Sequence, residues 1–256
     1  PLPPEHVMNL YDRYLLPRLI DFACGMGEVM KLRSQLVPQA HGEVLEIGIG
    51  TGLNLSFYDP TRVTRIVGVD PAAQMQDIAR RRAAEISIPV DMLALELGQI
   101  QAVDGRFDSI VCTFTLFSIP DVGAALMEMR RVLKAGGRLL FAEHGLAPDA
   151  GVAQWQGRLT PYWKPLAGGC HLDRDIPRLL GHAGFAIREL DSGYLKGPRP
   201  MTYVYRGWAQ PVWASPFRVG DVTGRSTASS TPKIPGARRF AYADTRTATL
   251  EKQSQQ

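Results

Sequence analysis

The stretch Glu43-Val-Leu-Glu-Ile-Gly-Ile-Gly-Thr-Gly52 is a short apolar run that ends in glycines. It predicts a strand buried on both faces that enters a tight turn. Three glycines at alternate positions, Gly48, Gly50 and Gly52, let a ligand approach the backbone closely because they carry no side chains. A tight strand-to-helix turn without a ligand needs the same glycines, so the turn alone does not establish a binding site.

The next buried strand, Arg65-Ile-Val-Gly-Val-Asp70, ends in an acid 22 residues after Gly48. A carboxylate in this place can accept two charge-assisted hydrogen bonds from ribose hydroxyls. Asp70 could equally cap the following helix, with Pro71 in the first turn, where its missing N–H costs nothing. The two roles of Asp70 are compatible.

Strands and helices alternate through the next hundred residues. We expect residues 52–58 to open a helix, a further helix to run from Pro71 to about Ile86, and strands at 89–95, 107–114 and 138–143. A helix at 121–133 is expected to stop at Gly136-Gly137. This alternation predicts an α/β, doubly wound, mostly parallel sheet with ligand sites at the C-terminal ends of its strands.

The pattern changes beyond this region. Residues 148–170 are rich in Trp, Pro and Gly and are expected to be irregular, followed by a helix near 173–183. Two strands, 186–190 and 201–208, suit an antiparallel hairpin that closes one edge of the sheet.

The chain divides into three parts on these patterns. Residues 1–40 carry apolar residues at helical spacing, interrupted at Pro17 and Gly25, and predict a helical lid segment that includes Tyr11 and Tyr14. Amphipathic packing explains those tyrosines as easily as a lid. Residues 41–213 form the main domain, and residues 214–256 read as an extended or disordered basic tail.

The distribution of charge, cysteines and apolar residues argues against several classes of protein. The formal charge of +4 resides in residues 218–256, which hold seven basic and three acidic residues, so the body lacks a basic face for nucleic acid. Three widely spaced cysteines offer neither a disulfide framework nor a CxxC metal site. No run of about 18 apolar residues is present, so we expect no integral membrane segment and a cytoplasmic location.

A dinucleotide-dependent oxidoreductase is an alternative function, and the spacing of the glycines in the turn tests it. Dinucleotide sites use GxGxxG and hold a pyrophosphate on a helix N-terminus, whereas the glycines here follow GxGxG. Glu46 also precedes them by two residues, and its carboxylate would repel a pyrophosphate. The turn therefore favours a cationic ligand that carries an amino acid.

Four segments together resemble the class I S-adenosylmethionine-dependent methyltransferases. They are Val44–Gly52, Val67–Asp70, Arg106–Cys112 and Val132–Arg138. Within that superfamily the chain is similar to ubiquinone/menaquinone-type and alkyl-thiol methyltransferases, through Gly52–Tyr58, Val111–Ser118, Phe141–His144 and Gly169–Leu172. The mammalian alkyl-thiol enzymes begin with a hydrophobic membrane anchor, and from this sequence we expect none.

The resemblance implies a seven-stranded Rossmann-like methyltransferase fold and S-adenosylmethionine as cofactor. By position, Gly48, Gly50 and Gly52 would pass beneath its methionine and ribose, with Asp70 and Pro71 at the ribose and Glu46 at the methionine end. Glu96 with Leu97 would contact the adenine. Thr113 and Phe114 would lie where cofactor and acceptor meet, although ordinary packing at a strand end explains them equally well.

The acceptor is expected to be a small molecule, a thiol or a phenol, near His144, Cys170, His171, Trp155 and Trp163. His144 and His171 are the candidate catalytic bases, since a phenol would benefit from one. The alternative for these residues is structural, with the tryptophans in the core and His171 capping a helix. A catalytically silent cofactor-binding protein is the remaining alternative for the whole chain.

Overall fold

The computed structural model describes residues 21, 24–93, 95–96, 99–212 and 238–239. Its main sheet has the strand order β10-β8-β9-β7-β6-β1-β2-β3. All pairings are parallel except those of β9, which runs antiparallel to both β7 and β8. The strands are β1 Gly42–Ile47, β2 Val63–Val69, β3 Val90–Leu93, β6 Phe107–Thr113, β7 Leu133–His144, β8 Phe185–Tyr194, β9 Tyr203–Pro211 and the two-residue β10 Arg238–Arg239.

This topology confirms the predicted mostly parallel sheet with an antiparallel hairpin at one edge. From β1 the chain moves outward to β2 and β3, then returns to place β6 on the other side of β1. The C-terminal ends of β1, β2 and β6 therefore meet at the point where the strand order reverses, which is where open α/β sheets bind ligands. The glycine-rich turn leaves the sheet at this point.

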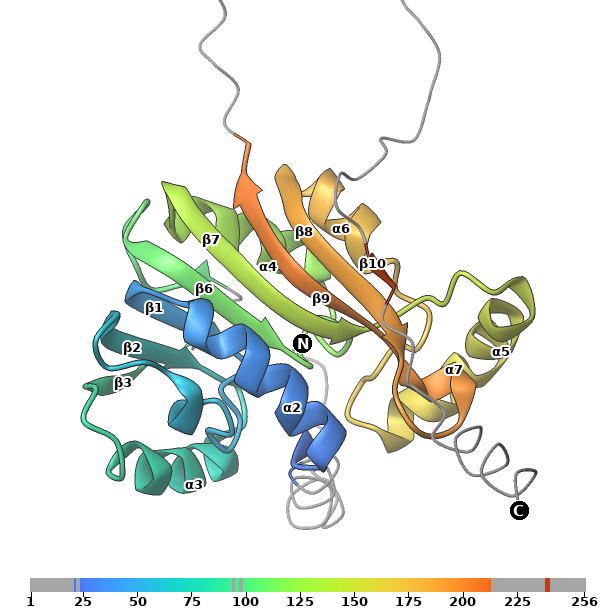
Figure 1. Ribbon diagram of the computed structural model, residues 1–256, viewed down its shortest axis with the longest axis horizontal. Coiled ribbons are helices and arrows are strands. Elements are labelled where there is room, and N and C mark those ends of the chain that lie inside the picture. The colour runs from blue at the N-terminus through green and yellow to red at the C-terminus, as the bar shows by residue number, and fades with distance from the viewer. Residues whose placement is uncertain (1–20, 22–23, 94, 97–98, 213–237, 240–256) are drawn as a thin grey trace, which may run out of the picture.

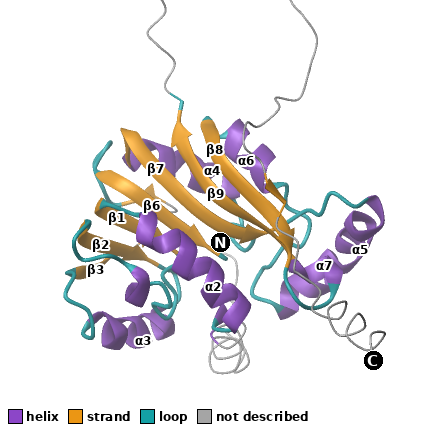
Figure 2. Ribbon diagram, viewed as in Figure 1, coloured by secondary structure: helices purple, strands orange, loops and turns teal. Residues whose placement is uncertain are grey.

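Helices cover both faces of the sheet (Figures 1 and 2). In the view of Figure 1, α2 crosses the near face while α4 and α6 lie behind it. Each face has its own core: one cluster includes Leu126, Met129 and Leu180, and the other includes Leu36, Val111 and Leu140. The helices are α2 Gly27–Leu36, α3 Ala73–Ala83, α4 Val122–Val132, α5 Ala150–Leu166, α6 Ile176–His182 and α7 Arg199–Thr202.

The segment after the glycine turn differs from the prediction. Residues 52–58 do not open an α-helix; they contain only the short 3-10 turn Leu55–Phe57. Gly52 adopts φ +81°, outside the helical region, and Pro60 follows soon after, so little chain is left for a helix. Asn54 and Tyr58 instead direct their side chains to Glu46.

The expectation of an irregular stretch at 148–170 is also wrong, because α5 spans Ala150–Leu166 with Pro161 and Pro165 inside it. Tertiary hydrogen bonds offset the backbone bonds that the prolines remove. The buried amide of Gln156 donates to the carbonyls of Gly145 and Pro200 and accepts from the Ala147 amide. The sequence pattern could not reveal these long-range partners.

Smaller differences concern element boundaries. Gly136 and Gly137 do not stop a helix: α4 ends at Val132, and both glycines lie within β7, where its register with β6 shifts. The predicted strand 89–95 is shorter in the sheet, and a separate antiparallel pair follows, β4 Leu95–Glu96 with β5 Gln99–Ile100. The helix predicted from Pro71 begins at Ala73, so Pro71 precedes it.

The ends of the chain are described only in part. The predicted interruption at Gly25 is confirmed by a turn there, and α2 begins two residues later. Tyr11, Tyr14 and Pro17 lie outside the described residues. Of the predicted tail, Arg238 and Arg239 are described and pair with Asp191 and Ser192 of β8. None of the described helices is both long and apolar enough to cross a lipid bilayer.

Candidate active site

The glycine turn after β1 uses backbone angles that L-residues rarely adopt. Gly48, Gly50 and Gly52 have φ of +68°, +54° and +81°. A Cβ on Gly48 would lie 2.3 Å from Thr115 Oγ1, and one on Gly52 would lie 2.7 Å from Leu55. A Cβ on Gly50 would meet nothing closer than 3.8 Å. Packing therefore excludes side chains at Gly48 and Gly52, whereas Gly50 borders open space beside Asp70.

Asp70 follows β2 and faces this turn. Its Oδ2 accepts a hydrogen bond from the Gly50 amide at 2.9 Å, and its Oδ1 accepts one from the Ala72 amide at 2.8 Å. Burial raises the pKa of the carboxyl group, and the two amides oppose that shift. Asp70 therefore lies against the glycine turn, as its predicted ribose contact requires. Its bond to the Ala72 amide precedes α3, whose N-cap residue is Ala72 and not Asp70 as the capping alternative expected. Pro71 is next to it and is exposed.

Glu46 lies inside β1 and is 2% exposed. Asn54 Nδ2 donates to its Oε1 at 3.0 Å, and the Tyr58 hydroxyl donates to its Oε2 at 2.8 Å. Burial raises the pKa of Glu46 to about 7, against these two hydrogen bonds. The acid is thus held rigidly beneath the turn, and its proton is exchangeable near neutral pH.

Arg33 of α2 enters the same network, which sequence reasoning did not foresee. It is 5% exposed, and its Nη1 donates to Asn54 Oδ1 at 2.8 Å and to Thr113 Oγ1 at 2.5 Å. Its guanidinium carbon lies 5.4 Å from the ring centre of Phe114. Phe114 has φ +54°, an unusual angle for a non-glycine residue. The pairing of β1 with β6, which aligns Ile47 with Cys112, places Thr113 and Phe114 beside the glycine turn, where Arg33 and Asn54 contact them.

Glu143 near the end of β7 organises the loop that follows β6. It is fully buried, and both of its oxygens accept from the Thr115 amide at 3.0 Å. Burial raises its pKa to about 8, so the group is largely protonated at neutral pH. Because Thr115 packs against Gly48, this bond connects the end of β7 to the glycine turn.

A second, uncharged cluster adjoins Glu143. His144 Nε2 lies 3.1 Å from Cys170 Sγ, Trp163 Nε1 donates to the same sulfur at 3.3 Å, and the Phe117 ring centre is 4.1 Å from that of His144. Burial lowers the pKa of His144 to about 4 and raises that of Cys170 to about 12. Both groups are therefore neutral near pH 7. Nδ1 of His144 is buried and has no hydrogen-bond partner among the described residues.

The other acceptor-site candidates are placed differently. Trp155 is 56% exposed on α5, so it does not occupy a core position, and its contact with the acceptor stays a prediction. The His171 amide donates to the Phe117 carbonyl, while its ring is partly exposed, 4.0 Å from Asp173. Within the described part of the chain, no three His, Cys, Asp or Glu side chains cluster as metal ligands.

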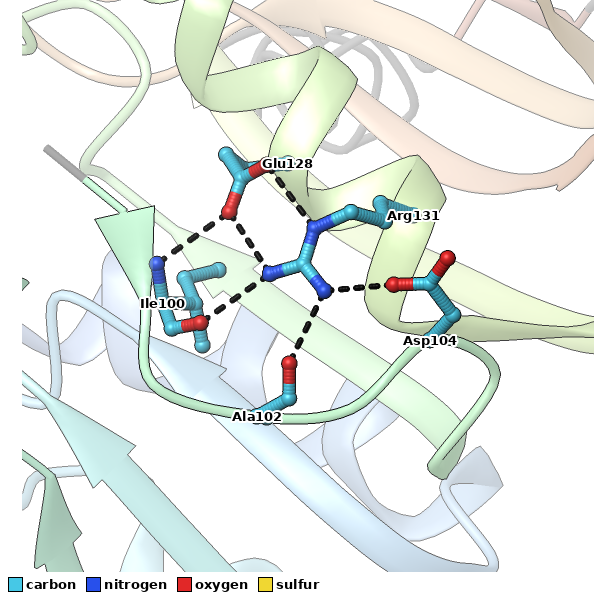
Figure 3. A network of polar contacts seen from close by, with 5 residues as sticks. All are labelled: Ile100, Ala102, Asp104, Glu128 and Arg131. Atoms are coloured by element: carbon cyan, nitrogen blue, oxygen red, sulfur yellow. Dashed lines mark hydrogen bonds and ion pairs between the residues drawn. The ribbon is translucent and has the colours of Figure 1, made fainter.

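The predicted adenine contact falls on the β4–β5 hairpin, where Glu96 ends β4 and Leu97 lies outside the described residues. Arg131 of α4 anchors this hairpin (Figure 3). Its guanidinium donates to the carbonyls of Ile100 and Ala102 at 3.0 and 2.8 Å and to Glu128 at 2.8 Å. Glu128 in turn accepts from the Ile100 amide at 3.2 Å.

The residues at this edge fit an adenosyl group that carries an amino acid. Gly50 leaves room against the backbone, Asp70 offers a carboxylate beside it, and Arg33 Nε is buried without a hydrogen-bond partner among the described residues. Glu46, Asn54 and Thr113 add polar groups at the same place. A sequence signal for the missed residues exists only for Glu143, an acid that directly follows the apolar run Leu139–Ala142.

Comparisons with known proteins agree with this geometry. The Methyltransferase domain family model matches residues 45–141. Human thiol S-methyltransferase TMT1B is 33% identical over 171 residues, covering 64% of this chain and 68% of the relative. Demethylmenaquinone methyltransferase of Thermus thermophilus is 32% identical over 134 residues, covering 52% and 60%.

A solved SAM-dependent methyltransferase from Aquifex aeolicus superposes with a TM-score of 0.54 at 17% identity, covering 77% of this chain and 98% of that one. This likeness supports the fold. Across the matched thiol S-methyltransferases, the chain spans 62% to 71% of the relative's length. On the combined evidence of the sequence match, the sheet order and the glycine turn, the chain belongs to the class I S-adenosylmethionine-dependent methyltransferases.

Proposed function

We propose that this protein transfers the methyl group of S-adenosylmethionine to the sulfur of a small lipophilic thiol. The observation that carries the acceptor class is the uncharged cluster of His144, Cys170, Trp163 and Phe117 next to the cofactor edge. The named thiol S-methyltransferases among the relatives support the same class.

The cluster suits an acceptor that ionises without much help. A thiol has an ordinary pKa of about 8.5, so part of it is thiolate at neutral pH, whereas a phenol has an ordinary pKa of about 10. His144 is neutral and a weak base, because burial lowers its pKa to about 4. A strong general base is therefore lacking at His144, and this favours sulfur over a phenolic oxygen.

The cofactor supplies an already activated methyl group, so the protein's task is alignment and the exclusion of water. In this proposal Asp70 and the glycine turn hold the adenosyl side, and Thr113 and Phe114 lie where the cofactor and the acceptor meet. His144 can orient the acceptor through Nδ1, which has no partner among the described residues. His171 is the weaker candidate, since its ring is partly exposed.

The test uses purified full chain, labelled S-adenosylmethionine, and the matched acceptors 4-methylbenzenethiol and 4-methylphenol, with 1-octanethiol as an alkyl thiol. Labelled thioether from both thiols and no labelled ether from the phenol is the expected result. Asp70→Ala serves as the inactive control. Binding of S-adenosylhomocysteine with no product from any thiol would support the silent binding protein instead, and methylation of the phenol alone would reject the thiol.

A cytoplasmic location and the absence of a nucleic-acid substrate remain predictions from the sequence. The roles of the individual site residues are likewise proposals that these experiments test.

A further inference from the structure

Arg33 is a buried cation, and its hydrogen-bond partners among the described residues are all neutral. It bonds the amide oxygen of Asn54 and the hydroxyl of Thr113, and the thiol of Cys24 also lies within its reach. No described carboxylate forms an ion pair with it. Glu46 attracts the guanidinium through space but does not bond to it. Burying a guanidinium without a directly bonded counter-charge is costly, so this position can accept an anionic ligand group.

The same network holds an acid a short distance away. The side-chain amide of Asn54 accepts from Arg33 through Oδ1 and donates to Glu46 through Nδ2. Asn54 therefore lies between the guanidinium and the carboxyl group. Tyr58 and Thr113 fix the outer sides of this arrangement. A buried guanidinium and a buried carboxyl group on one rigid frame match the carboxylate and ammonium of a free amino acid.

Arg33 Nε adds the second observation. It is buried and has no hydrogen-bond partner among the described residues, although a guanidinium offers its donors as a planar fork. The fork is therefore incompletely used by the protein. It lies beside Thr113 and Phe114, and the pairing of β1 with β6 puts these two residues next to the glycine turn, where the methionine end of the cofactor is expected.

We infer that Arg33 binds the α-carboxylate of the cofactor's methionine moiety, so that the helix α2 selects ligands that carry an intact amino acid. This inference rests on the proposed function only in taking S-adenosylmethionine as the ligand, and it is independent of the methyl acceptor. It also gives α2 a binding role in addition to its packing on the sheet.

The test compares two ligands by calorimetry: S-adenosylhomocysteine and its decarboxylated analogue, which keeps the amine and lacks only the carboxylate. The natural protein is expected to prefer S-adenosylhomocysteine by about 10- to 100-fold, the worth of one charged hydrogen-bonded contact. In Arg33→Met that preference disappears. Arg33→Lys, which keeps the charge and loses the fork, restores part of it.

Arg65→Met is the matched control, because Arg65 is half exposed and pairs with Asp91 near the start of β2. It should keep the full preference. An equal preference in the natural protein and in folded Arg33→Met, with melting temperatures measured for both, would overturn the inference while leaving the proposed function standing. If the natural protein binds neither ligand, both the inference and the proposed function are wrong.

Discussion

Asp70 accepts hydrogen bonds from two amides of its own chain, Gly50 N and Ala72 N. A ribose would therefore bind a carboxylate that is already oriented. We predict that Asp70→Ala weakens the affinity for S-adenosylhomocysteine by about 100-fold or more, because two charge-assisted bonds of ~1.5–3 kcal/mol each are lost. Calorimetry measures the change.

Asp77→Ala is the control for this substitution, since Asp77 is an exposed acid on α3 that pairs with Arg80. Its affinity should equal that of the natural protein. If Asp70→Ala binds as tightly as the control, Asp70 is only a local cap.

Glu46 provides a prediction about pH. Its pKa is raised from 4.5 to about 7 by burial, so the folded protein holds a proton that the unfolded chain releases between these values. The stability that this proton contributes is present below pH 4.5 and is lost as the pH rises through about 7. Glu46→Gln removes this dependence.

We compare the unfolding free energies of Glu46→Gln and the natural protein, both free of ligand. The variant's advantage over the natural protein should be about 2–3 kcal/mol larger at pH 8 than at pH 5. Denaturant titrations at the two pH values measure it, and the other titrating groups cancel in the comparison. The same substitution should weaken the binding of S-adenosylhomocysteine. A difference that is equal at both pH values would show that Glu46 is ionised throughout.

At the residue scale, the sequence predicted what local conformation demands. Gly48 and Gly52 could be identified because a turn that closes on Thr115 and Leu55 tolerates no side chain, and Asp70 because it follows a strand. Arg33 could not be identified, because in sequence it is one more polar residue of an amphipathic helix. Its burial depends on Asn54 and Thr113, which lie 21 and 80 residues away.

At the scale of elements, the β4–β5 hairpin depends on Arg131 of α4. The guanidinium bonds the carbonyl of Ile100 in β5 and that of Ala102 just beyond it, and it holds Glu128 against the Ile100 amide (Figure 3). We predict that Arg131→Met speeds hydrogen exchange at Ile100 and weakens the affinity for S-adenosylhomocysteine about fivefold, equivalent to ~1 kcal/mol. Exchange mass spectrometry and calorimetry measure the two effects.

Arg130→Met is a suitable control. Arg130 is next to Arg131, but its guanidinium donates to the carbonyl of Val212, just after β9, and not to the β4–β5 hairpin. Unchanged exchange at Ile100 in Arg131→Met would show that β5 is held by other contacts. Faster exchange with unchanged affinity would show that the hairpin does not contact the adenine, and the assignment of Glu96 and Leu97 would fall.

Element types were predictable where a periodic pattern and a local signal agreed, as for β1, β2 and α4. They were not predictable where distant contacts overrode local preference. In α5 the buried Gln156 bonds Gly145 and Pro200 and so supports a helix that its prolines disfavour. After Gly52, the bonds of Asn54 and Tyr58 to Glu46 take the place of an expected helix.

At the scale of the whole molecule, the order of the strands separates the site from the far edge of the sheet. The glycine turn and Asp70 follow β1 and β2, and Thr113 ends β6, whereas β10 pairs with β8 at the opposite edge. Strand order follows from the alternation of strands and helices, which is why the fold could be predicted while the fine structure of the site could not.

This separation predicts the effect of removing the basic tail. A chain that ends after Ser215 loses β10 but keeps every residue of the described site, so its affinity for S-adenosylhomocysteine should equal that of the full chain. The backbone groups of β8 that pair with Arg238 and Arg239 become free, and an exposed strand edge promotes association between copies. We therefore expect more self-association on light scattering with unchanged calorimetric affinity. Weaker binding by the truncated chain would show that the tail contributes to the cofactor site.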